Sequence, residues 1–166
     1  MMTAWDDRPQ DVSNLLNPSF VGLLLYRAVQ GYKREAAAGM PFELIVLVLS
    51  FVLHGATRSR LPATITTSLP TWIQLNRDAL LEFAKRTQAL LPFTKEAISF
   101  LAERGVLAFD EKGRVDVGTS KLTGVTQYQQ STDEIAACYK RAEFVGRWLS
   151  LAGSPTTVFM LLGIRP

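Results

Sequence analysis

The sequence predicts a mainly α fold, a single helical domain of residues 1–166 that contains a winged helix-turn-helix with a short β-hairpin wing. Three observations predict it. Apolar residues recur at helical spacing along most of the chain, two segments are apolar enough to form buried helices, and a short polar turn separates two β-branched runs. The length of 166 residues suits one domain with a sizeable core.

Two strongly apolar helices are expected first. Asn17 is a good N-cap, Pro18 suits a first helical turn, and residues 20–29 are apolar on nearly all sides. Residues 44–53 are apolar except for one serine and too short to span a bilayer, which requires about 20 apolar residues, so a core helix is favoured over a buried strand. Either the core absorbs both helices, or one of them lies at a subunit interface.

Residues 76–118 carry the predicted winged helix-turn-helix. Asn76 can cap a first helix, and Pro92 should end it because proline disfavours a helical residue before it. Thr94 can cap a second helix, which should end at Gly105, where a left-handed residue is favoured.

The wing is predicted from residues 106–109 and 114–117, which flank a four-residue turn. The alternative is a plain helical hairpin followed by an unrelated β-hairpin. A helix that reads DNA should present a positive face to the phosphates, but the charges of the second helix sum to zero and the wing carries three acidic against two basic side chains. The side chains concerned are Lys95, Glu96, Ser99, Glu103 and Arg104 on the helix, and Asp110, Glu111, Lys112, Arg114 and Asp116 on the wing. Direct DNA reading is therefore the weaker hypothesis, and docking on a protein is the stronger one.

Residues 131–166 are predicted to form C-terminal packing helices. Ser131 and Glu134 match a capping box, and the helix that follows keeps one apolar face as far as Gly153. Ser154 then begins a short last helix. Such an apolar tail should pack on the domain or on a partner.

The chain lacks the usual parts of an active site. His54 is its single histidine and Cys138 its single cysteine, which excludes two-histidine metal sites and paired-thiolate zinc ligation. Cys138 lies among apolar helix positions and is expected to be buried. No phosphate-binding glycine-rich loop and no serine-hydrolase motif is present. We therefore expect no metal, no cofactor and no enzymatic activity.

Charge gives two further expectations. The net charge of +3 is basic but lacks the concentrated positive field of a stand-alone nucleic-acid binder. Residues 1–7 are acidic where a signal peptide would be basic, so a cytoplasmic location is expected.

The best candidate site is the polar segment that contains His54, Thr57, Arg58 and Arg60. Arginine beside hydroxyl groups can bind a phosphate or the carboxylate of a partner. The alternative is that His54 and Arg58 cap the carbonyl groups at the end of the preceding helix, where cations are favoured. Glu143 and Arg147 are spaced for a surface ion pair. The remaining candidate interface residues are Lys95, Glu103, Arg104, Arg147 and Trp148.

Short motifs are spread over almost the full length. They are Asn14-Leu-Leu-Asn-Pro18, Gly31-Tyr32, Leu53-His54, Thr57-Arg58, Leu61-Pro62, Trp72, Pro92-Phe-Thr94, Gly146-Arg-Trp148 and Gly163-Ile-Arg-Pro166. Their order and spacing resemble the middle component of bacterial three-component ABC systems.

This resemblance implies a small accessory subunit that acts with an ABC ATPase of the SMC, RecF or Rad50 type and with an effector protein, in anti-phage systems related in layout to Lamassu. It implies a winged helix and an adaptor role, and it transfers no catalytic residue. DNA contact, if any, is expected to be indirect or confined to the backbone, and no membrane contact is expected. The alternatives are a winged-helix DNA-binding regulator and, more remotely, a small enzyme that depends on His54.

Overall fold

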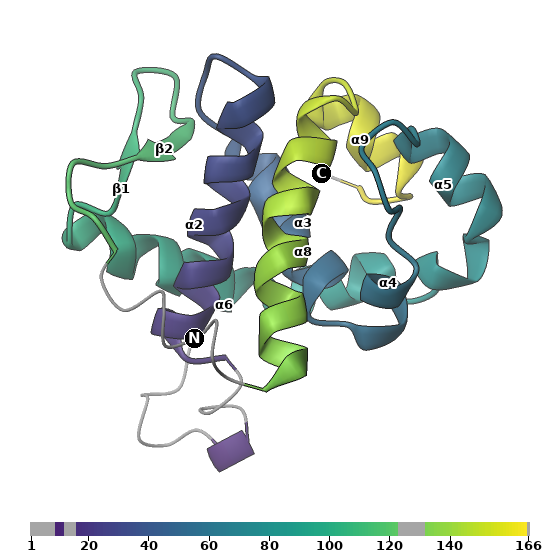
Figure 1. The fold of residues 1–166 in the computed structure, drawn as a ribbon, viewed down its shortest axis with the longest axis horizontal. Coiled ribbons are helices and arrows are strands. Elements are labelled where there is room, and N and C mark those ends of the chain that lie inside the picture. Colours follow the sequence, from purple (N-terminus) through teal and green to yellow (C-terminus); the bar gives the residue numbers. More distant parts are fainter. Residues whose placement is uncertain (1–8, 12–15, 123–131, 166) are drawn as a thin grey trace.

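The computed structural model describes residues 9–11, 16–122 and 132–165, and it is mainly helical with one small antiparallel sheet (Figure 1). The elements, in chain order, are α2 (Pro18–Glu35), α3 (Phe42–Val52), α4 (Gly55–Ser59), α5 (Leu69–Leu75), the 3-10 helix η2 (Arg77–Leu80), α6 (Phe83–Glu103), β1 (Leu107–Phe109), β2 (Val115–Val117), α8 (Asp133–Ser150) and α9 (Pro155–Leu161). The predicted mainly α fold is confirmed.

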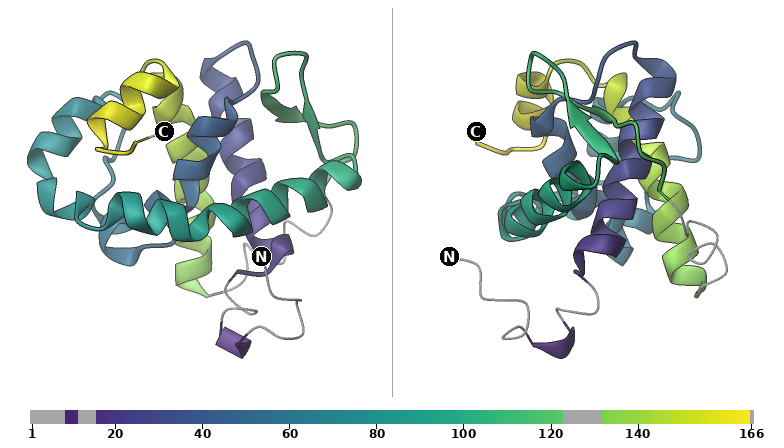
Figure 2. Two further views of the ribbon diagram at one scale, coloured as in Figure 1. Left: turned by 180° about the vertical axis from the view of Figure 1, so that it is seen from behind. Right: turned by 90° about the vertical axis from the view of Figure 1, so that its left-hand side faces the viewer.

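Helices α2 and α3 form the centre of the molecule. The Asn17 side chain caps α2 by accepting a hydrogen bond from the backbone N–H of Phe20 at 2.7 Å, as predicted. In α3 every residue from Leu44 to Val52 is buried, which confirms the core helix. Helix α8 packs beside α2, and α6 runs across α2 and α3 (Figure 2). The core of one chain therefore absorbs both apolar helices.

Glycine allows α2 and α8 to approach until their backbones touch. A Cβ atom on Gly146 would lie 1.9 Å from the carbonyl oxygen of Ala28, and one on Gly31 would lie 2.2 Å from that of Glu143. Real Cβ atoms do not come so close to backbone atoms, so no side chain fits at either position.

The helix-turn-helix predicted within residues 76–118 is wrong, because α6 is one continuous helix with Pro92 inside it. Proline in a helix interior removes one backbone hydrogen bond, and here tertiary packing outweighs that loss. The buried side chains of α6 continue along one face on both sides of the proline: Phe83, Thr87, Thr94, Ala97, Ile98 and Leu101. Thr94 caps nothing; its hydroxyl donates to the carbonyl of Leu90 at 3.2 Å.

Asn76 is not the helix cap that its sequence position predicts. Its side chain donates to the carbonyl of Trp72 at 2.9 Å, so it closes the end of α5. It makes no side-chain capping bond to η2, and α6 begins only after Glu82, whose backbone is left-handed with φ 61°.

The hairpin is confirmed. Strands β1 and β2 pair in antiparallel register, and the Asp110 carboxylate closes the turn by accepting from the backbone N–H groups of Lys112 and Arg114 at 2.8 and 2.9 Å. Gly105 ends α6 with φ +68°, as predicted. Met40, between α2 and α3, adds a bridge to Val115 through two backbone hydrogen bonds of 2.8 and 2.9 Å. The hairpin is thereby tied to the central helices.

The C-terminal helices also follow the prediction. Helix α8 has an apolar face in the core, but its N-cap is Thr132, which makes no side-chain capping hydrogen bond, and Ser131 of the predicted capping box lies outside the described residues. Ser154 caps α9 by accepting from the N–H of Thr157 at 3.2 Å, and Val158 packs the helix onto the core. Within the described ranges, no helix is both long enough and apolar enough to cross a bilayer.

Replacing Gly146 with alanine should lower the free energy of unfolding by roughly 3 kcal/mol, and Tm by roughly 10 °C, because α8 must move away from α2. Gly55→Ala is the matched control, since a Cβ there would meet only the end of the Arg58 side chain at 3.8 Å. Thermal unfolding followed by circular dichroism measures both variants. Equal melting temperatures would contradict the proposed contact.

Replacing Pro92 with alanine should raise the free energy of unfolding by roughly 1–3 kcal/mol, because alanine restores the missing hydrogen bond within a continuous helix. Denaturant unfolding measures the change. A chain with a turn at Leu91 would gain nothing from this substitution or would lose stability.

Candidate functional site

The predicted polar cluster begins where α3 ends. His54 is the N-cap of α4: its Nδ1 accepts from the N–H of Thr57 at 3.3 Å and lies 2.8 Å from the Thr57 hydroxyl oxygen. Arg58 donates from Nη1 to the carbonyl of Val52 at 2.7 Å. The predicted capping of α3 by Arg58 is confirmed. The same role for His54 is wrong, because α4 begins at the next residue and the His54 side chain caps the N-terminus of α4 instead.

Both arginines of this cluster have acidic partners within the chain. Arg58 lies 3.2 Å from the carboxylate of Glu134 on α8, and Arg60 forms an ion pair with Asp78. The backbone carbonyl of Arg60 accepts from the indole N–H of Trp72 at 2.7 Å. These two guanidinium groups connect the segment after α3 to α8 and η2, and their ion pairs leave less positive charge for a phosphate.

Trp148, a predicted interface residue, lies in the core. Its side chain is 1% exposed, its indole N–H donates to the carbonyl of Thr67 at 2.7 Å, and its ring makes edge-on contact with Phe51 and Trp72. It joins the segment before α5 to α8 and presents no surface to a partner.

The predicted ion pair between Glu143 and Arg147 is wrong. Glu143 pairs with Arg27 and Arg34 of α2, and Arg147 pairs with Glu35, whose Oε1 lies 2.7 Å from its Nη2. Because glycine brings α2 against α8, the charges of the neighbouring helix are better placed than those one turn away.

Lys95, Glu103 and Arg104 are exposed on the C-terminal half of α6, with the Arg104 guanidinium stacked 3.6 Å from the centre of the Phe100 ring. They lie apart from the His54 cluster, which contacts α6 through Arg86. The distance along the helix from Arg86 to Glu103 is roughly 25 Å. The structure therefore does not combine the predicted residues into one site.

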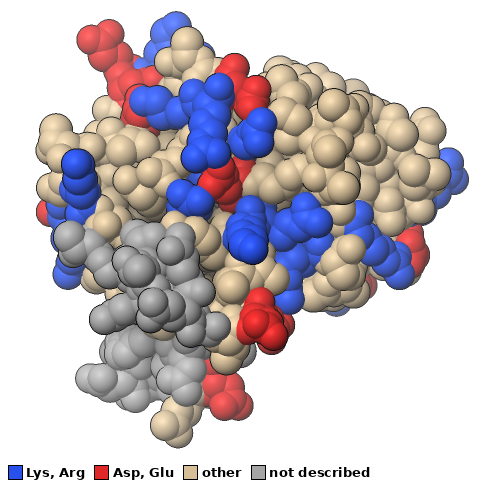
Figure 3. All heavy atoms as spheres, in the orientation of Figure 1, with Lys and Arg blue, Asp and Glu red and all other residues tan. Residues whose placement is uncertain are grey.

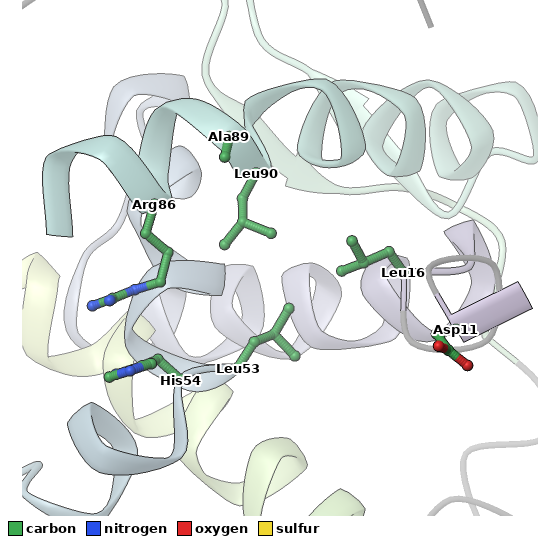
Figure 4. Close-up of a pocket in the computed structure, with 7 residues that line it drawn as sticks. All are labelled: Asp11, Leu16, Leu53, His54, Arg86, Ala89 and Leu90. Carbon is green, nitrogen blue, oxygen red and sulfur yellow. The ribbon is translucent and has the colours of Figure 1, made fainter. Parts of the chain in front are cut away.

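The sequence analysis missed Arg86, which lies on a pocket of about 410 Å³ lined by Asp11, Leu16, Leu53, His54, Arg86, Ala89 and Leu90 (Figure 4). Arg86 and His54 lie together at one end of this pocket, Asp11 lies at the other, and the leucines lie between. The only sequence signal was an arginine three and four residues before Ala89 and Leu90, on the same side of a helix.

Arg86 has few internal partners. It donates from Nη2 to the Thr57 hydroxyl at 3.4 Å, and its guanidinium carbon Cζ lies 5.5 Å from the centre of the Phe83 ring. Its Nε is buried without a hydrogen-bond partner, and Arg86 forms no ion pair with any described acidic side chain. Glu82, which acts on it through space, is ion-paired with Lys85 at 3.0 Å.

The cationic side chains at this end of the pocket influence the pKa of His54. Partial burial lowers the pKa of His54, and the positive charges of Arg86 and Arg58 lower it further. Burial also lowers the pKa of the Arg86 guanidinium. Since Nδ1 of His54 accepts from Thr57, the neutral ring carries its proton on Nε2. One end of the pocket therefore offers several donors and little acceptor capacity.

The remaining chemistry is limited. Cys138 is buried as predicted, and desolvation raises the pKa of its thiol. In the part of the chain that the structure describes, no three histidine, cysteine or acidic side chains are grouped to hold a metal ion.

Comparison with protein families gave one match. The model of a family described as ABC-three component (ABC-3C) system Middle Component 3 matches residues 5–166. Comparison with curated proteins and with solved structures gave no match.

Because His54 is the only histidine and its pKa is lowered on folding, the folded state binds fewer protons than the unfolded state near that pKa. Stability should therefore be complete above about pH 6.5 and should fall as the pH drops through this value towards the folded pKa. NMR titration of the single imidazole measures the pKa directly, and Arg86→Met should raise it. An imidazole that titrates at 6.5 or higher in the wild type would contradict this prediction.

Proposed function

The chain belongs to the middle component 3 family of ABC-three component systems, and from this membership we propose that it is a non-catalytic adaptor that links an SMC-, RecF- or Rad50-like ABC ATPase to an effector protein in an anti-phage defence complex. The family match over residues 5–166 carries the proposal. A middle component implies other components, and protein contact is the role that its surfaces suit best.

We infer that a winged helix begins before residue 76 and combines α2 and α3 with α6 and the hairpin. Helix α2, the Met40 bridge, α3, α6, β1 and β2 follow the order of a winged helix, in which a short strand after the first helix pairs with the second strand of the wing. Helix α6 then occupies the position of the recognition helix. The elements from α4 to η2 are an insertion between the two helices of the motif.

The exposed end of α6 supports protein docking. Lys95 and Arg104 are offset in sequence by two glutamates, and the hairpin tip carries Asp110 and Glu111 beside Lys112. A surface with balanced charges gains little from DNA phosphates, whereas it is suited to a partner with a complementary pattern.

A second surface region is formed by segments without ionisable side chains. Residues 61–76 and 148–164 contain no acidic, basic or histidine side chain. They include α5 and α9, where Figure 3 shows an almost uncharged area at the upper right. Leu75 of α5 and Met160 of α9 are each 76% exposed, and Leu151, which follows α8, is 58% exposed. Exposed apolar side chains of this kind favour contact with a protein.

A DNA-binding regulator is the second candidate, favoured by the basic side chains of α2 and α8 in the middle of Figure 3. Lys33, Arg34 and Arg147 are paired with Asp116, Glu143 and Glu35, so part of this positive charge is already balanced within the chain. This candidate predicts duplex binding with a steep salt dependence that weakens when Arg58, Arg60 or Arg114 is replaced.

Coexpression with the products of the neighbouring genes tests the adaptor. A tagged chain should recover the ATPase and the effector together, and the effector should not recover the ATPase when this chain is omitted. Binding of the two partners to each other without the chain would overturn the adaptor role. Tight, salt-sensitive duplex binding by the isolated chain would favour the regulator.

The uncharged surface provides a sharper variant. Leu75→Glu combined with Met160→Glu should reduce recovery of at least one partner about tenfold, because a charge must then be desolvated at the contact. Ala37→Glu combined with Thr132→Glu, which adds the same two charges at exposed positions outside α5, α6 and α9, is the control. Both proteins should melt as the wild type does, since the substituted side chains are exposed.

A further inference from the structure

Arg86 is a partly buried cation whose Nε donates to nothing, at the end of an apolar pocket. We propose that this pocket binds a segment of a partner protein in which a carboxylate lies beside apolar side chains, with the carboxylate paired to Arg86. The proposal rests on the adaptor function above and names the chemistry of one contact.

The charges call for an anion. Arg58, whose charge acts on His54, is paired with Glu134, but Arg86 forms no ion pair among the described side chains. Asp11 lines the opposite end of the pocket and does not pair with Arg86 (Figure 4). A guanidinium binds a carboxylate through two parallel hydrogen bonds, and the unused Nε is one of the donors that such a pair employs.

The walls call for an apolar ligand. Leu16, Leu53, Ala89 and Leu90 line the pocket between its charged ends. A volume of about 410 Å³ lies in the range of pockets that bind small ligands or inserted side chains. Free phosphate would leave these walls uncovered, and Arg58 and Arg60 are already engaged with carboxylates. A peptide segment supplies both the charge and the apolar surface.

Stability alone does not account for Arg86. Partial burial lowers the pKa of Arg86, and no described acidic side chain is ion-paired with it, so burial disfavours its charged form. Its neighbour Lys85 shows the ordinary arrangement: it is exposed and ion-paired with Glu82. A side chain whose burial is energetically unfavourable, and which lies at a pocket, is typical of a binding site.

The first test uses two capped tripeptides, acetyl-leucyl-leucyl-glutamate amide and its glutamine counterpart, with the full chain. The glutamate peptide should bind about tenfold more tightly, because only it offers a charged acceptor. Backbone amide shifts should map to Leu53, His54, Ala89 and Leu90. Equal binding of the two peptides, or equal shifts caused by inorganic phosphate, would overturn the proposal.

Variants then separate binding from folding. Arg86→Met should abolish the preference for the glutamate peptide while Tm stays the same or rises, because a desolvated charge is lost. Arg86→Lys should keep only part of the preference, since an ammonium cannot form the paired bonds. Lys85→Met removes a neighbouring charge and should bind as the wild type does. A drop in Tm for Arg86→Met would assign Arg86 a structural role and overturn the proposal.

The last test identifies the occupant in the complex. A photo-crosslinking amino acid at position 89 should attach to a partner segment that contains an acidic residue next to apolar ones. A crosslink to this chain's own residues, or to a segment without acids, would overturn the proposal. If no partner is recovered at all, the adaptor function fails, while the peptide comparison still decides the chemistry of the pocket.

Discussion

The backbone contact between α2 and α8 is the constraint on which the rest of the fold depends. Gly31 and Gly146 remove the side chains that would hold the two helices apart. Helix α8 can then cover a face of α2 that α3 and α6 leave open, so a helix that is apolar on all sides is buried within one chain. The ion pairs between the helices follow from the same approach, since Arg147 reaches Glu35 only across a short gap.

The sequence predicts those features whose cause is local. Asn17 and Ser154 cap their helices with their own side chains, and Gly105 ends α6 because only its own backbone angle matters. Pro92 misleads for the opposite reason. Its local effect is unfavourable, but the buried face of α6 packs on α2 and α3 along its whole length, and that packing involves residues far away in the chain.

The candidate site divides in the same way. The His54 cluster is visible in the sequence because its polar residues are adjacent, and their mutual hydrogen bonds are local. The partners that occupy Arg58 and Arg60 come from α8 and η2, so their engagement depends on the fold. Arg86 stands out only once α3 and α6 are packed together, because a lone arginine on a helix is unremarkable until its surroundings are known.

An adaptor must hold two different partners, and this requires surfaces that select different chemistry. The uncharged surface over α5 and α9 has no charge with which to pair a charged side chain of a partner. Burying such a charge against it would be unfavourable, so this surface favours apolar partner surfaces. The Arg86 pocket requires an acid. The two surfaces share no residue, and each lies outside the paired charges that join α2 to α8. The contacts that stabilise the fold are therefore separate from those left available for partners, which allows either surface to be occupied without breaking the core.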